Sequence, residues 1–124
     1  MAKPEIGSIG WIDLTVPDAT NVKDFYCEVV GWESAAFPVS DYQDYCVGAK
    51  PSENPVAGIC HALGQNSQLP QQWLIYIVVE NVAQSVKKCI DNGGTVVCEP
   101  RPMGEGTVAV IRDPSGAACA LYEA

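Results

Sequence analysis

Histidine is nearly absent from this sequence of 124 residues, and its scarcity restricts the chemistry that the chain can perform. The one histidine is His61. A zinc site of the HExxH type needs two histidines, and so does an iron site of two histidines and one carboxylate, so the sequence excludes both. No serine stands in a GxSxG nucleophile elbow. Metalloproteases, non-heme iron oxygenases and serine hydrolases of these types are therefore excluded.

Basic residues are also few. The chain has 7 Lys and Arg against 15 Asp and Glu, a formal net charge of −8, and no run of Lys or Arg. Binding to nucleic-acid phosphates or to anionic lipid needs a basic surface, so neither nucleic acid nor a membrane is an expected partner. Two interpretations of the acidic excess stay open. It favours a cationic or neutral small ligand, or it is a surface kept acidic for solubility.

Long apolar runs and paired cysteines are missing too. No stretch approaches the roughly 18 apolar residues of a membrane span, and the N-terminal residues MAKPEIGSIGW lack the apolar run of a signal peptide. A cytoplasmic protein is therefore expected. The cysteines form no CxxC pair and are predicted to be buried free thiols rather than three disulfides. They are Cys27, Cys46, Cys60, Cys89, Cys98 and Cys119.

What the sequence does contain is a repeat. The apolar pattern of residues 11–32 returns in residues 74–94, and Val16 matches Val79 at an offset of 63 residues. An offset of about half the chain length indicates a duplicated unit. We expect one domain over residues 1–124, with a first unit at 8–63 and a second at 72–124.

The first unit is predicted to begin with a strand and a helix. Residues 9–16 alternate in polarity, as a strand with one buried face does. Pro17-Asp18 then breaks the strand and offers a helix cap, and apolar residues recur at helical spacing until Gly31 ends the helix. Two or three short strands are predicted to follow, at roughly 32–37, 42–48 and 56–62.

A polar connector, residues 64–72, leads to the second unit, which repeats the order of the first. Asn81 followed by Gln84 resembles a capping box that opens a helix. The buried face of this helix is predicted to carry Val82, Val86, Cys89 and Ile90. Strands are predicted at 74–79, 95–98, 107–111 and 117–123.

Three segments resemble one known superfamily. They are VPDATNVKDFYCEVVGW, VVENVAQSVKKCIDNGG and IRDPSGAACALYEA, the last of which is similar to a closing strand with the pattern DPDGN-x-hydrophobic-E-L. The chain thereby resembles the vicinal oxygen chelate superfamily, which includes glyoxalase I, the bleomycin and fosfomycin resistance proteins, extradiol dioxygenases and methylmalonyl-CoA epimerase. The resemblance implies an α+β fold in which two repeated βαβββ units form a cup-shaped mixed sheet. It also implies a homodimer.

The resemblance further implies where relatives bind a divalent metal ion. Their ligands are His, Glu or Gln at four inward positions, one on the first and one on the last strand of each unit. Carried over to this sequence, these positions are Trp11, Leu74, Ala120 and Ile59. None of these side chains offers a carboxylate, imidazole or thiolate donor, so no metal and no other cofactor is expected.

The residues that line the cup follow from the period of two along each strand. Asp13 and His61 are the candidate catalytic residues, because histidine is the natural proton carrier near neutral pH and a carboxylate can orient it or act as the base itself. The alternative gives both residues ordinary structural hydrogen bonds and places the aromatic residues in the core. The candidate ligand-binding residues are Trp11, Thr15, Ile59, Leu74, Tyr76, Ala120 and Tyr122.

Three hypotheses about function follow. The first is a metal-free homodimer that binds a small organic molecule in the cup, as bleomycin-resistance proteins bind a drug without chemistry. The second is a lyase or isomerase of the same fold in which His61 and Asp13 transfer a proton next to a carbonyl group. The third is a structural or regulatory domain with a sealed apolar cup.

Overall fold

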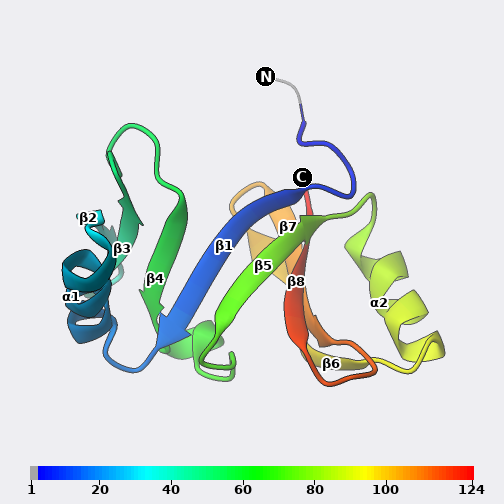
Figure 1. Cartoon of the computed structure of the whole chain (residues 1–124). Coiled ribbons are helices and arrows are strands. Elements are labelled where there is room, and N and C mark those ends of the chain that lie inside the picture. Colours follow the sequence, from blue (N-terminus) through cyan, green and yellow to red (C-terminus); the bar gives the residue numbers. More distant parts are fainter. Residues whose placement is uncertain (1–2) are drawn as a thin grey trace. The chain divides into compact units, whose positions relative to one another are not determined.

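The computed structural model describes residues 3–124, and its elements follow the duplicated order. The α+β fold of two βαβββ repeats is confirmed (Figure 1). The first repeat consists of β1 (Ile9–Val16), α1 (Ala19–Val30), β2 (Glu33–Val39), β3 (Tyr42–Gly48) and β4 (Ala57–His61). After a short 3-10 helix, η1 (Gly64–Asn66), the second repeat consists of β5 (Trp73–Val78), α2 (Val82–Asp91), β6 (Thr95–Met103), β7 (Gly106–Arg112) and β8 (Ala118–Glu123).

The chain folds into two compact units that do not quite coincide with the repeats. The α1 unit is Ile12–Trp73, and the α2 unit joins the residues up to Trp11 to Leu74–Ala124. The start of the chain belongs to the α2 unit because it pairs with β5. The Gly7 amide donates to the Val78 carbonyl (2.7 Å), and the Val78 amide donates to the Ser8 carbonyl (2.9 Å).

The α1 unit has the strand order β2-β3-β4-β1, with β1 and β4 parallel and the other pairs antiparallel. Helix α1 begins where the Asp18 carboxylate accepts a hydrogen bond from the Asn21 amide (3.0 Å). It ends at Gly31, whose φ of 76° lies in the left-handed region that glycine adopts readily. Both boundaries were predicted. The buried core of this unit consists of Leu14, Val16, Ala19, Tyr45, Val47, Ala57 and Ile59.

The α2 unit repeats this plan with the strand order β5-β8-β7-β6, and β5 and β8 are parallel. The predicted cap of α2 is present, because the Asn81 side chain accepts a hydrogen bond from the Gln84 amide (2.9 Å). Val82 and Val86 are buried as predicted, and they pack with Ala109 and Leu121. The prediction for Ile90 was wrong: this side chain is 57% exposed, because it lies outside the stripe that contacts the sheet.

Strand β6 is longer than predicted. It continues from Thr95 to Met103, through Pro100 and Pro102, and its register with β7 shifts twice. The strand lies at the edge of the α2 unit, where proline is tolerated because no neighbouring strand needs its amide hydrogen. The prolines and charged residues in the second half of this strand do not fit the alternating pattern by which a strand is predicted from sequence.

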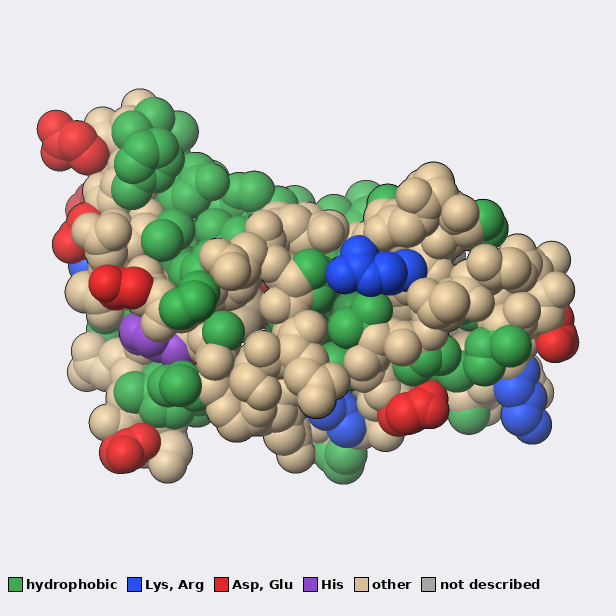
Figure 2. All heavy atoms as spheres, turned by 90° about the horizontal axis from the view of Figure 1, so that it is seen from below, with side chains coloured by type: hydrophobic (Ala, Val, Ile, Leu, Met, Phe, Trp, Pro, Cys, Tyr) green, Lys and Arg blue, Asp and Glu red, His purple; other side chains and the backbone are tan. Residues whose placement is uncertain are grey.

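The cysteines are free, as predicted, but each is only partly buried. Among residues 3–124, neither helix is long and apolar enough to cross a bilayer. On the face shown in Figure 2, the Lys and Arg side chains stand apart from one another rather than forming a continuous basic patch.

Candidate functional site

The α2 unit contains a cavity of about 360 Å³ on the face of its sheet opposite α2. That volume lies within the usual range of small-molecule sites. Strand pairing explains how the cavity forms. Tyr76 pairs with Ala120 and Val78 with Tyr122, so these side chains share one face, while Leu121 points to the other face and packs under α2. The lining residues are Pro4, Gly10, Trp11, Tyr76, Val78, Met103, Gly104 and Tyr122.

The chemistry of this cavity is aromatic and uncharged. Trp11, Tyr76 and Tyr122 contribute three rings, Met103 contributes a thioether, and none of the lining residues carries a charge. Aromatic faces and a polarizable sulfur are well suited to contact a flat organic molecule. The cavity can therefore enclose an apolar ligand.

Three of the residues predicted to bind a ligand line this cavity, namely Trp11, Tyr76 and Tyr122. Two others from the same unit do not: Leu74 is 3% exposed and Ala120 is fully buried, so both belong to the packed part of the sheet. A role of any of them in binding stays a prediction.

The β6–β7 hairpin supplies lining residues that the sequence pattern did not predict. Met103 ends β6, and Gly104 begins the turn that leads to β7. No sequence signal placed this turn at the cavity, because the curvature of a long, bulged edge strand depends on its pairing with β7.

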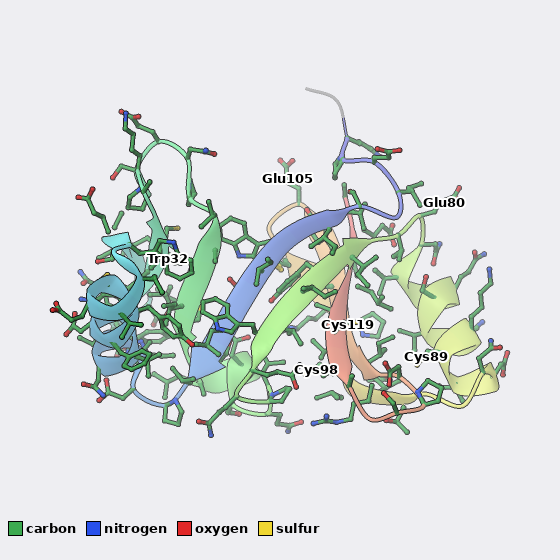
Figure 3. The ribbon with its side chains drawn as sticks, viewed as in Figure 1. Trp32, Glu80, Cys89, Cys98, Glu105 and Cys119 are labelled. Carbon is green, nitrogen blue, oxygen red and sulfur yellow. The ribbon has the colours of Figure 1, made fainter. Side chains whose placement is uncertain are left out.

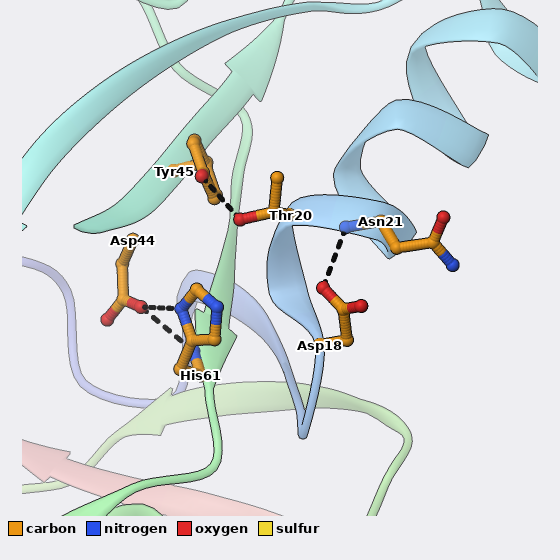
Figure 4. A network of polar contacts seen from close by, with 6 residues as sticks. All are labelled: Asp18, Thr20, Asn21, Asp44, Tyr45 and His61. Carbon is orange, nitrogen blue, oxygen red and sulfur yellow. Dashed lines mark hydrogen bonds and ion pairs between the residues drawn. The ribbon is translucent and has the colours of Figure 1, made fainter. Parts of the chain in front are cut away.

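In the α1 unit, His61 lies beside Asp44 rather than Asp13. One carboxylate oxygen of Asp44 accepts the His61 amide hydrogen at 2.8 Å and lies 3.2 Å from Nδ1 of the ring (Figure 4). Asp44 is only 4% exposed, and the His61 side chain is 16% exposed. The single histidine is visible at the surface in Figure 2, in purple. A buried carboxylate thus orients a ring that remains within reach of solvent.

Aromatic groups surround this pair. The rings of Tyr42 and Tyr45 have centroids 5.6 Å and 6.5 Å from that of His61. The Tyr45 hydroxyl is tied to Thr20 Oγ1 by a hydrogen bond of 2.7 Å. The pKa of Tyr42 is raised, first by burial and then by the nearby Asp44 carboxylate. His61 is therefore held between a carboxylate and two phenol rings.

The predicted pairing of His61 with Asp13 was wrong. In the parallel pair β1–β4, Asp13 stands opposite Gly58 and Val16 stands opposite His61. Asp13 and His61 are therefore three positions apart along the strands, about 10 Å, and their β-carbons point to opposite faces. Asp13 cannot orient the His61 ring directly.

The same register corrects the assignment of Ile59 as a residue that lines the cup. Thr15 pairs with Cys60 and Leu14 with Ile59, so Ile59 shares the face of Leu14, toward α1, and not that of Thr15. Ile59 has no exposed surface and Thr15 is 4% exposed. Ile59 therefore belongs to the core of the α1 unit.

Comparison with known proteins decides the family. The family model described as Glyoxalase/Bleomycin resistance protein/Dioxygenase superfamily matches residues 8–121. The chain belongs to this superfamily. The resemblance stated from the sequence is confirmed.

Curated relatives in the superfamily cover nearly the whole chain. A protein named putative glyoxylase CFP32, from Mycobacterium tuberculosis, is 32% identical over 95% of this chain but over only 46% of its own length. The chain thus spans about half the length of the first relatives it matches. A probable lactoylglutathione lyase from Synechocystis is 32% identical, over 83% of this chain and 85% of its own length. A superfamily member of known structure from Vibrio splendidus has a TM-score of 0.59 and 10% identity, with 92% of this chain and 97% of that chain covered.

The metal positions of the superfamily do not fit a cation in this chain. Strand pairing places Tyr76 opposite Ala120 and, in the first repeat, Asp13 opposite Gly58. The counterpart of Ala120 is therefore Gly58, and the position predicted at Ile59 was wrong by one residue. The four positions are then Trp11, Leu74, Ala120 and Gly58, which supply no carboxylate, imidazole or thiolate. Within residues 3–124, no group of three or more His, Cys, Asp or Glu side chains is arranged to hold a metal ion. Absence of a metal ion from the protein itself stays a prediction.

Proposed function

We propose that the protein binds a small, flat, mainly apolar organic molecule in the cavity of the α2 unit, without a divalent metal ion. The observation that carries the proposal is the cavity of about 360 Å³ with its three aromatic rings and Met103. A ligand that stacks on these rings gains apolar burial together with the geometric preference of aromatic pairs. The lining residues provide no charged group to hold an ionic ligand, which favours a neutral one.

The donor chemistry of the superfamily positions supports the metal-free part of the proposal. Trp11, which stands at one of these positions, also lines the cavity. Where enzymes of the superfamily place a ligand for a metal ion, this chain places an indole ring. We infer that the position has changed from holding a cation to contacting an apolar ligand. The homodimer and the cytoplasmic location stay predictions.

Replacing Trp11 by alanine is expected to weaken binding of N-phenyl-1-naphthylamine, a neutral aromatic probe, about thirtyfold. Loss of one stacking surface costs roughly 2 kcal/mol of binding free energy, and each 1.4 kcal/mol changes affinity tenfold. Fluorescence titration with and without EDTA measures the effect, and the wild-type affinity is expected to be the same in both buffers.

The matched control is Phe25→Ala, which removes an aromatic ring that is 56% exposed on α1 and does not line the cavity. This variant is expected to bind the probe as the wild type does. Equal losses in Trp11→Ala and Phe25→Ala would mean that the probe binds exposed apolar surface in general, and an EDTA-sensitive affinity would contradict the metal-free site.

A second candidate function rests on His61 and Asp44. A carboxylate at Nδ1 leaves Nε2 available as a general base, the arrangement that positions catalytic histidines. The His61 side chain is 16% exposed, so the ring keeps contact with solvent. This geometry supports a lyase or isomerase that moves a proton next to a carbonyl group, and the Synechocystis relative is named a probable lactoylglutathione lyase.

If the protein is such an enzyme, His61→Ala is expected to lower metal-free turnover of lactoylglutathione at least about a hundredfold, the usual contribution of a general base. Asp44→Asn is expected to lower kcat because the ring loses its orienting charge, whereas Asp13→Asn is expected to change kcat little. Formation or consumption of lactoylglutathione is followed after treatment with EDTA. Full activity in His61→Ala excludes this function and leaves the binding protein as the conclusion.

A further inference from the structure

Two cysteines share the face of the α1-unit sheet that lies opposite α1. Cys46 on β3 stands directly opposite Gly58 on β4, and Cys60 follows two residues further along β4. Strand residues two apart point to the same face, so both thiols lie on one side of the sheet. Gly58 has no side chain and Ile59 points toward α1, so no side chain of β4 stands between the two cysteines.

The spacing of this pair excludes a relaxed disulfide and suits a bridging ion. Diagonal neighbours on antiparallel strands have α-carbons roughly 7–8 Å apart, beyond the usual range of a disulfide. Two metal–sulfur bonds of about 2.3 Å in a line separate the sulfurs by about 4.6 Å, far more than the S–S bond of a disulfide.

Negative charge surrounds the two thiols. Asp13 pairs with Gly58 from the other side and so shares this face, and Asp44 hydrogen bonds to the Cys60 thiol. Burial, followed by the Asp13 and Asp44 carboxylates, raises the pKa of Cys60, and burial and Asp13 raise that of Cys46. Both groups are therefore protonated thiols at neutral pH, which react slowly with oxidants and alkylating agents. A metal cation that binds both sulfurs must displace these protons.

We propose that Cys46 and Cys60 form a two-thiolate site for a soft metal cation that accepts linear two-coordination, of which Cu(I) is the biological example. Binding forms two metal–sulfur bonds and releases both thiol protons, so Cu⁺ and two thiols give a bis-thiolate complex and two protons, with no change of oxidation state. The described residues offer no group of three or more donors, so the site suits an ion satisfied by two. Thiolate ligands select Cu(I) over harder divalent ions.

The test is anaerobic competition for Cu(I) between the full chain and the chromogenic chelator bicinchoninate. The wild type is expected to remove one Cu(I) per chain from the chelator. Cys46→Ser and Cys60→Ser are each expected to bind about a hundredfold more weakly, because one donor alone lacks the advantage of a chelate. Native mass spectrometry checks the stoichiometry and the loss of two protons.

The matched controls are Cys98→Ser, on β6, and Cys119→Ser, on β8, each in the α2 unit (Figure 3). Both are expected to bind Cu(I) as the wild type does. Retention of Cu(I) in both Cys46→Ser and Cys60→Ser, or its loss in Cys119→Ser, would overturn the proposal, as would equal loss in all variants.

A chain in which the other four cysteines are serine is expected to keep one Cu(I), and circular dichroism confirms that each variant is folded. Because the aromatic cavity includes neither Cys46 nor Cys60, probe binding is expected to be unaffected, so the two proposals fail independently.

Discussion

Replacing Ile59 by alanine is expected to lower the free energy of unfolding by about 3–4 kcal/mol. Ile59 has no exposed surface and packs with Leu14, Val16 and Tyr45 between the sheet and α1. Truncating it removes apolar contacts and leaves a cavity in a densely packed core. Urea unfolding followed by circular dichroism gives the difference from the wild type.

Val56→Ala provides the comparison, because Val56 is 49% exposed just before β4 and its truncation is expected to cost less than about 1 kcal/mol. The experiment also decides between the two roles given to Ile59. A variant that keeps its stability but binds the cavity probe more weakly would restore the ligand-binding role predicted from the sequence and contradict the core position.

Gly106→Ala is expected to destabilise the protein by about 2–3 kcal/mol and to disturb the ligand cavity. A β-carbon at residue 106 would collide with the Glu123 carbonyl oxygen and come within 2.6 Å of the Tyr122 hydroxyl. The backbone of β8 cannot yield without breaking its pairing with β7, so the strain falls on both strands and on the Tyr122 ring. Thermal unfolding measures the stability, and near-ultraviolet circular dichroism reports on the tyrosine environment.

The control for this substitution lies two residues away. Gly104 has a φ of 59° but open space around its α-carbon, so Gly104→Ala is expected to cost only the backbone strain, about 1 kcal/mol. Similar losses in the two variants would show that crowding against Tyr122 is unimportant.

The strands and helices were largely predictable because they depend on local patterns. Asp18, Gly31 and Asn81 mark helix ends through hydrogen bonds or backbone angles that these residue types favour wherever they occur. Strand β6 was the exception. Its edge position permits prolines that a strand pattern read from the sequence does not allow.

The two repeats show where prediction of side-chain orientation succeeds and fails. In the second repeat the sequence correctly placed Tyr76 and Tyr122 on one face, and the β5–β8 register agrees. In the first repeat the same reasoning placed Ile59 and His61 with Asp13, but the β1–β4 register puts Gly58 and Cys60 on that face. An error of one residue in the register moves every side chain of the strand to the opposite face of the sheet, because side chains alternate with a period of two.

The sequence by itself determined the duplication, the order of the elements, membership of the superfamily and the lack of metal donors at Trp11, Leu74 and Ala120. These are properties of residue type and spacing along the chain. Only the tertiary structure decided that Asp44 orients His61, that Gly58 replaces Ile59 at the fourth position, and that the β6–β7 hairpin contributes Met103 to the cavity. Each of these depends on which strands pair and in which register. That choice is made by packing between residues far apart in the sequence.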